Sequence, residues 1–130
     1  MTEALVLDAS AMVTMLIGGQ SAEPIATRLR GCVIHVPAHF DAEVLSALGR
    51  LSRAGKLTPR EVSWRLDVLA AAPFERHPIA PLLASAWRLR ARVRLVDALY
   101  LALAVALAVP IITLDRGLAS AAPRAELLQV

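Results

Sequence analysis

The sequence of 130 residues contains very little cysteine. Cys32 is the only one, so no disulfide can form within the chain. The segment Met1 to Leu7 contains no basic residue, unlike the start of a secretory signal. A chain without disulfides or such a signal suits a reducing compartment, and we therefore expect this protein in the cytoplasm.

The sequence also lacks a hydrophobic run of membrane-spanning length. The uncharged stretch from Ala98 to Leu114 has 17 residues and contains Pro110. A spanning helix needs about 20 predominantly apolar residues. We interpret this stretch as a buried helix followed by a buried strand, and we expect no association with a membrane.

Zinc-binding patterns, repeats and linkers are absent as well. His35, His39 and His77 are scattered, and their spacing to Cys32 matches no zinc site. No Pro-, Gly- or Ser-rich tract divides the chain. Residues 1–130 are therefore expected to form a single domain.

Apolar residues and arginine dominate what is present. Hydrophobic residues make up 57% of the chain and the mean hydropathy is +0.58, which excludes a disordered protein and indicates apolar surface reserved for a partner. The net charge is +3 and the isoelectric point is about 10.0, with Lys56 the only lysine. A basic surface fits a nucleic-acid partner, but arginine in place of lysine is also typical of GC-rich genomes. Both interpretations stay open.

Short apolar runs alternate with helical patterns along the chain. Such continuous apolar strands are typical of a parallel sheet covered on both faces, so we predict an α/β fold of three layers, α/β/α, with about four to five strands. Thr58, Pro59 and Glu61 have the spacing of a helical capping box. The predicted strands are 4–7, 33–36, 111–114 and 126–130, with 74–78 as a strand or connector, and the predicted helices are 9–17, 21–31, 38–54, 58–72, 80–93, 97–109 and 118–122.

Three aspartates occupy positions where α/β sheets build their sites. Asp8 and Asp115 each follow an apolar strand, and Asp97 opens a predicted helix. Ligands bind at the carboxyl ends of parallel strands. Grouped carboxylates repel each other unless a cation joins them, and oxygen-only ligation suits Mg²⁺ or Mn²⁺. Taken singly, Asp8 and Asp97 are better explained as helix N-caps and Asp115 as a turn residue, and only their joint placement favours a site.

Four segments resemble the motifs of PIN-domain ribonucleases, and in particular the VapC toxins of bacterial toxin–antitoxin pairs. They occur in that family's order and span the whole chain. The resemblance implies a PIN-domain-like fold and a cluster of Asp8, Glu43, Asp97 and Asp115 around one or two Mg²⁺ or Mn²⁺ ions. The segments are Val6-Leu7-Asp8-Ala9-Ser10-Ala11, Pro37-Ala38-His39-Phe40-Asp41-Ala42-Glu43-Val44, Asp97-Ala98-Leu99-Tyr100-Leu101-Ala102-Leu103-Ala104 and Ile112-Thr113-Leu114-Asp115-Arg116-Gly117-Leu118.

The same resemblance implies an activity and partners. VapC-like proteins are endoribonucleases that hydrolyse RNA through a metal-activated water, leaving 5′-phosphate and 3′-hydroxyl ends. Their usual partner is a VapB antitoxin, and homodimers are common. Ser10 and Thr113 are expected either to position the acids or to bond locally to the backbone. Arg116 is expected to contact an RNA phosphate.

Other charged and aromatic residues are more ambiguous. Helical periodicity does not choose between Asp41 and Glu43; the family pattern favours Glu43 as the site residue and leaves Asp41 as a first-turn acid that complements the helix dipole. The basic run of Arg88, Arg90, Arg92 and Arg94 either grips RNA or forms a solvated face. Trp64 and Trp87 lie amid apolar residues, so we expect them in the core or in an interface.

Two other functions are compatible with part of the pattern. A haloacid-dehalogenase-type phosphatase also begins with an aspartate after its first strand, but it needs a second aspartate where this chain has Ser10. A catalytically inactive PIN-like module that binds RNA or protein is the other alternative. Such a module is expected to have lost an acid, whereas all four are present here.

Overall fold

A five-stranded sheet forms the centre of the computed structural model, which describes residues 2–122 and 124–128. All neighbouring strands are parallel, in the order β3-β2-β1-β4-β5. The predicted parallel sheet is therefore confirmed, with 74–78 contributing a strand. The strands are β1 (Ala4–Leu7), β2 (Val33–Pro37), β3 (Glu75–His77), β4 (Ile111–Thr113) and β5 (Ala125–Leu127).

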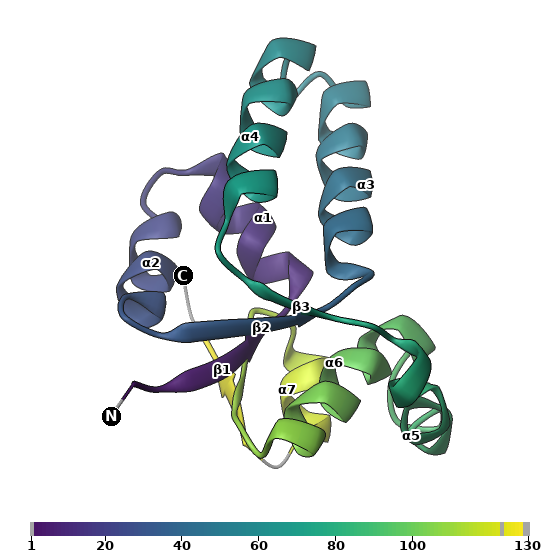
Figure 1. Cartoon of the computed structure of the whole chain (residues 1–130). Helices are drawn as coiled ribbons and strands as arrows, with labels where there is room; N and C mark the ends of the chain where they lie inside the picture. The colour runs from purple at the N-terminus through teal and green to yellow at the C-terminus, as the bar shows by residue number, and fades with distance from the viewer. Residues whose placement is uncertain (1, 123, 129–130) are drawn as a thin grey trace.

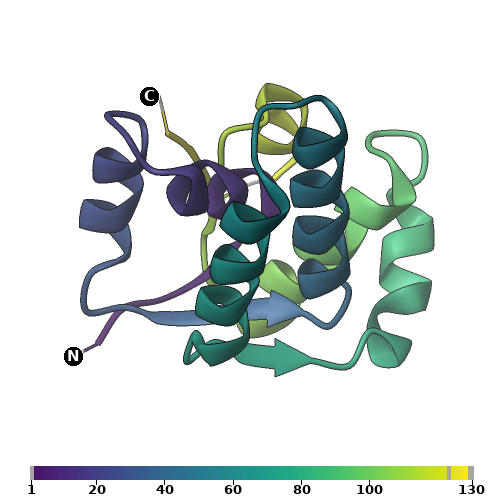
Figure 2. The ribbon, with the colours of Figure 1, turned by 90° about the horizontal axis from the view of Figure 1, so that it is seen from above.

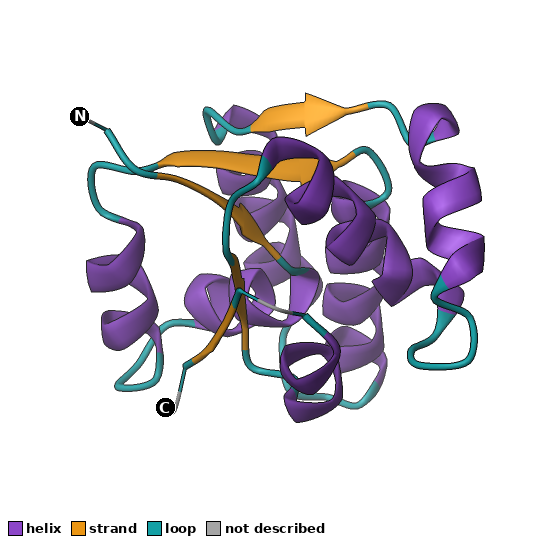
Figure 3. Ribbon diagram, turned by 90° about the horizontal axis from the view of Figure 1, so that it is seen from below, coloured by secondary structure: helices purple, strands orange, loops and turns teal. Residues whose placement is uncertain are grey.

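Helices cover both faces of the sheet and complete the predicted three layers. Figure 1 shows α1 to α4 on one side and α5 to α7 on the other, and Figures 2 and 3 view the molecule from these two sides. The helices are α1 (Ala9–Ile17), α2 (Ala22–Leu29), α3 (Phe40–Arg53), α4 (Pro59–Ala71), α5 (Leu83–Arg88), α6 (Leu95–Leu107) and α7 (Arg116–Ala121), with a 3₁₀ turn at Ala80–Leu82.

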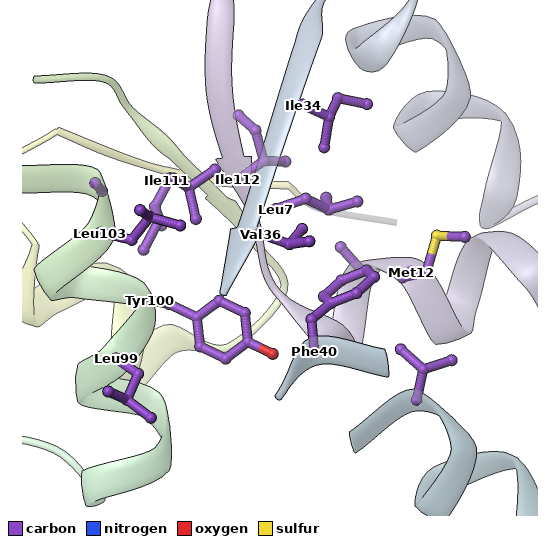
Figure 4. Packing of buried hydrophobic residues seen from close by; sticks show 14 of the residues in the cluster. Leu7, Met12, Ile34, Val36, Phe40, Leu99, Tyr100, Leu103, Ile111 and Ile112 are labelled. Carbon is purple, nitrogen blue, oxygen red and sulfur yellow. The ribbon is translucent and has the colours of Figure 1, made fainter. Parts of the chain in front are cut away.

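The core lies where these layers meet the central strands. Leu5, Val6 and Leu7 of β1 are fully buried, as expected for a strand covered on both faces. Phe40 of α3 and Tyr100 of α6 are the bulkiest side chains buried against them (Figure 4). Both helices are anchored in this core. This anchoring positions Glu43, one turn after Phe40, and Asp97, one turn before Tyr100.

Local sequence signals explain several element ends. Thr58 accepts a hydrogen bond from the Glu61 amide and Glu61 accepts one from the Thr58 amide, so the predicted capping box is confirmed. Helix α6 ends at Ala108, which adopts the left-handed conformation (φ 56°) two residues before Pro110. Helix α1 ends at Gly18 with φ 85°, a backbone conformation that favours glycine.

Some predicted elements differ from those observed. The helix predicted over 80–93 is only a 3₁₀ turn and α5, because the amides of Leu89 and Arg90 close the helix end with bonds to residues three earlier. Helix α6 begins at Leu95, so the expectation that Asp97 opens it was wrong by two residues. The last predicted strand is observed only at Ala125–Leu127, and residues 129–130 lie outside the described part.

The tryptophans are not in the core of the chain. Trp64 of α4 is 62% exposed and Trp87 of α5 is 57% exposed. The expectation of a core position was wrong, because each tryptophan lies on the exposed face of its helix; a role in an interface stays a prediction. Within residues 2–122 and 124–128, no helix combines the length and apolar character needed to cross a membrane.

Candidate active site

Asp8 lies at the topological switch point of the sheet, on either side of which the chain adds strands in opposite directions. It follows β1 and precedes α1, and β1 is flanked by β2 on one side and β4 on the other. Crevices at such a switch point bind ligands in open α/β sheets. Asp8 also caps α1, since its Oδ1 accepts from the Ala11 amide at 3.1 Å. The N-cap role of Asp8 is therefore compatible with the site role that the sequence predicts.

The Asp8 carboxylate is buried yet accepts several hydrogen bonds. It is only 5% exposed, and it accepts from the hydroxyls of Ser10 at 2.8 Å and Thr113 at 2.6 Å. Burial raises the pKa of Asp8; the hydrogen bonds from Thr113, Ala11 and Ser10 oppose the rise, and the charge of Asp115 adds to it. A buried carboxylate facing a second one is a favourable place for a cation.

Thr113 joins two of the acids. Its hydroxyl donates to Asp8 Oδ2 and accepts from the amide of Asp115 at 2.9 Å. Asp115 in turn caps α7, because its Oδ1 accepts from the amides of Gly117 at 2.8 Å and Leu118 at 3.2 Å. One buried threonine thus fixes the ends of β1 and β4 relative to each other.

Glu43 is held by two aromatic side chains. The Tyr100 hydroxyl donates to Glu43 Oε1 at 2.6 Å, and His39 Nε2 lies 3.3 Å from the same oxygen. His39 Nε2 also lies 2.9 Å from the Val96 carbonyl, which can only accept, so this nitrogen carries a hydrogen. Burial, followed by the bond to Glu43, raises the pKa of Tyr100, which stays a hydrogen-bond donor at neutral pH.

Asp41 and Glu43 point to different surroundings. Asp41 forms a bidentate ion pair with Arg76 of β3, at 2.7 and 3.1 Å, and does not line the cavity that Glu43 lines. Its role is thus an ion pair between α3 and β3, and not only the helix-dipole complement that we expected.

Asp97 lies in the first turn of α6 and pairs with the residue that precedes the helix. Arg94 Nε donates to Asp97 Oδ2 at 3.0 Å, and a second guanidinium nitrogen lies 3.4 Å from Oδ1. Asp97 is the third residue of the helix, so it is not the N-cap. Its carboxylate is free of any capping function.

The four acids line one cavity of about 320 Å³. Ser10 lines it as well, whereas Arg116, which is exposed at the start of α7, does not. Hard carboxylate oxygens around a buried charge suit Mg²⁺ or Mn²⁺. Among the residues that the structure describes, no three acidic, His or Cys side chains are grouped closely enough to enclose an ion.

Four residues near the acids were missed by the sequence reasoning. Arg50, Arg94 and Tyr100 line the cavity, and His39 contacts Glu43. Tyr100 stands three residues after Asp97, one helical turn on, and this spacing was available as a signal. Arg94 was considered only as part of a basic run, although it alone of that run lines the cavity among the described residues.

The comparison with known families covers nearly the whole chain. Residues 5–123 match the model of the PIN domain. The chain belongs to the PIN-domain family. It is 47% identical to Ribonuclease VapC3 of Mycobacterium tuberculosis, over 95% of this chain and 90% of that protein, which places it among the VapC proteins.

Solved structures agree on the fold of this PIN domain. PAE2754 from Pyrobaculum aerophilum matches with a TM-score of 0.74 and 22% identity, over 95% of this chain and 82% of that one. A toxin–antitoxin complex from Klebsiella pneumoniae matches with a TM-score of 0.66 and 16% identity, over 94% and 95%. The expected PIN-type α/β/α architecture is thus confirmed.

Proposed function

We propose that this VapC-family chain is a metal-dependent endoribonuclease and the toxin of a toxin–antitoxin pair. The observation that carries the proposal is the convergence of Asp8, Glu43, Asp97 and Asp115 on one cavity at the switch point of the sheet. The relatives named as VapC ribonucleases support the choice of RNA as the substrate. A phosphatase of the haloacid-dehalogenase type is disfavoured, since Ser10 supports Asp8 instead of supplying a second acid.

The roles of the residues follow from their contacts. The four acids would hold Mg²⁺ or Mn²⁺, which when bound supplies Lewis-acid activation of the phosphodiester and of water. Ser10 and Thr113 orient Asp8, and Tyr100 orients Glu43. Arg116 is assigned to a more distant RNA phosphate, since it is exposed beside Asp115 but outside the cavity.

The test of the activity is cleavage of labelled structured RNA by the purified chain with Mg²⁺, Mn²⁺ or EDTA. Asp8→Asn and Asp97→Asn should each abolish cleavage, whereas Asp67→Asn, an exposed acid on α4, should cleave like the wild type. Products should carry 5′-phosphates and 3′-hydroxyls. If the wild type cleaves no RNA and binds no Mn²⁺ in calorimetry, the chain is the inactive PIN-like binding module.

A VapB-like antitoxin is the partner that we propose for the cell. The solved toxin–antitoxin complex with the same fold supports it, as do exposed apolar residues such as Leu45, Trp64 and Val68 on α3 and α4. Expression of the wild type should arrest bacterial growth, and Asp97→Asn should not. Co-expression of the cognate antitoxin should lift the arrest, and the antitoxin should co-purify with the chain. Growth arrest by both the wild type and Asp97→Asn would contradict the proposal.

We also propose that the chain acts as a homodimer in the cytoplasm. The apolar surface supports the first part, and the free Cys32 thiol is compatible with the second. Light scattering of the purified chain should give twice the 13.9 kDa of one copy. A mass of one copy at every concentration would contradict the dimer.

A further inference from the structure

Arg94 places a positive charge at the mouth of the acidic cavity. It lines that cavity and donates two hydrogen bonds to Asp97, one through Nε and one through a terminal nitrogen. The bond to Asp97 raises the pKa of Arg94, and the charges of Asp97, Glu43 and Asp115 add to the rise. The guanidinium therefore lies in the field of three of the four acids.

The contact with Asp97 involves both oxygens that a metal ion would use. Arg94 Nε is 3.0 Å from Oδ2, and the terminal nitrogen is 3.4 Å from Oδ1. In the described part of the chain, neither Asp8 nor Asp115 forms an ion pair with a basic side chain. Arg94 is thus a cation that partly offsets the repulsion among the acids.

The side chain of Arg94 can leave this position easily. It is 75% exposed, whereas Asp97 is 16% exposed, so moving the arginine uncovers little apolar surface. Exposed ion pairs contribute little to stability, typically about 0.2–1 kcal/mol. Arg50, the other arginine of the cavity lining, instead donates to Ser46 one turn earlier on its own helix, and it forms no ion pair with the acids that the structure describes.

We propose that Arg94 is an exchangeable counter-ion of the site: it occupies Asp97 in the free protein and binds the RNA phosphate once a divalent cation has taken its place. This inference rests on the proposed ribonuclease function. The planar fork of a guanidinium matches two phosphate oxygens as well as two carboxylate oxygens, so the same group serves both states. The exchange also leaves a positive charge beside Asp97 both before and after the cation binds.

The exchange predicts that the loss of Arg94 affects cation binding and RNA cleavage in opposite directions. When Arg94 no longer competes for Asp97, the affinity for the cation should rise by roughly three- to five-fold. The gain is small because the ion pair that the cation displaces in the wild type is exposed. Without its phosphate contact, cleavage at saturating cation should fall, by roughly ten-fold or more. A residue that only stabilised the start of α6 would change neither quantity.

The experiment combines Mn²⁺ calorimetry on the RNA-free chain with cleavage kinetics at saturating Mn²⁺. The variants are Arg94→Ala and Arg94→Lys, with Arg60→Ala, an exposed arginine in the first turn of α4, as the charge-matched control. Arg94→Ala should tighten Mn²⁺ binding and lower kcat/KM, Arg94→Lys should recover part of the cleavage, and Arg60→Ala should resemble the wild type. Circular dichroism confirms that each variant is folded.

Three results would overturn the inference. If Arg94→Ala binds Mn²⁺ as the wild type does, or more weakly, Arg94 does not compete with the cation; if its cleavage is unchanged, Arg94 does not bind the substrate. Either result leaves the proposed function intact, provided that the wild type binds Mn²⁺ and cleaves RNA. A wild type that binds no Mn²⁺ overturns the proposed function and this inference together.

Discussion

At the scale of single residues, the same side chains cap helices and line the cavity of the proposed site. Asp8 caps α1 and Asp115 caps α7, and both also line the acidic cavity. The alternatives for these acids in the sequence, cap or site, were therefore not exclusive. The buried hydroxyl of Thr113 connects the two acids and transmits the position of one strand end to the other. The effects of substituting these residues should therefore be measured on both stability and activity.

Asp8→Asn should stabilise the metal-free fold while abolishing RNA cleavage. Asparagine keeps the cap on α1 and removes a charge whose burial is unfavourable. We expect a Tm higher by about 4 °C without metal, corresponding to about 1 kcal/mol. With excess Mg²⁺ the order should invert, since only the wild type gains binding energy. Differential scanning fluorimetry with and without Mg²⁺ measures both; a lower Tm of the variant without metal would contradict the account.

Tyr100→Phe should slow cleavage and also destabilise the fold, because a hydrogen bond to a carboxylate is lost. The ring still fills the core, but Glu43 loses the 2.6 Å bond from the hydroxyl. Hydrogen bonds to charged groups contribute about 1.5–3 kcal/mol, so we expect a roughly ten- to hundred-fold lower kcat. The combination with Glu43→Gln should cost no more than Glu43→Gln alone, because the two residues act as a unit. Additive losses in this double-mutant cycle would show that Tyr100 acts independently of Glu43.

At the scale of helices and strands, the sequence identified the regular elements better than their ends. The alternation of apolar runs predicted four of the five strands and left 74–78 as a strand or connector, and the capping box located the start of α4. The start of α6 was misplaced because Arg94, a residue without a capping side chain, precedes the helix. The helix over 80–93 was overextended because its composition stays helix-compatible, whereas α5 ends in i→i−3 bonds at Leu89 and Arg90.

The β2–β3 pair should make stability depend on pH near neutrality. His35 Nδ1 lies 2.9 Å from His77 Nε2 across these strands. Burial, and then the charge of His77, lowers the pKa of His35, opposed by Glu75. A histidine whose pKa is lower in the folded protein than in the unfolded chain is neutral in both above the unfolded pKa of about 6.5, so the fold has its full stability there. Stability is lost as the pH falls from that value toward the pKa of the folded protein.

Urea denaturation at about pH 7.5 and about pH 5.5 would measure this effect, because these two values lie on either side of the ordinary histidine pKa. The wild type should lose stability at the lower pH, and His35→Gln should lose less. His39→Gln is the matched control, because His39 lies outside the β2–β3 pair. Equal losses in the wild type and His35→Gln would assign the pH dependence to other groups.

At the scale of the whole molecule, the sheet order explains how distant acids meet. The strand order β3-β2-β1-β4-β5 puts Asp8 and Asp115 at adjacent strand ends although 107 positions separate them in the numbering. That adjacency could be expected from a parallel sheet, and the family resemblance supplied Glu43. The contact of Tyr100 with Glu43 could not be predicted, because it depends on how α6 packs against α3, whereas the spacing of Arg94 and Tyr100 from Asp97 was a local signal that the sequence reasoning did not use.

Arg28 joins the two ends of the chain, and its loss should destabilise the whole fold. From α2 it donates to Glu3, which precedes β1, and to Glu126 of β5. These bonds lower the pKa of both carboxylates, so their contribution is present above the unfolded value of about 4.3 and is lost as the pH falls through the lowered values. We therefore expect Arg28→Gln to lower the Tm at pH 7 by about 4 °C, and less at high salt.

The comparison that isolates this contact is calorimetry of wild type and Arg28→Gln at pH 7 and pH 3.5, at low and high salt. The difference between the two proteins should shrink at the lower pH, where Glu3 and Glu126 become protonated, and also in high salt. Arg60→Gln removes the same charge from an exposed position and should show neither trend. A difference that stays constant with pH and salt would mean that Arg28 acts through packing of its aliphatic stem, which is half-buried beside Cys32.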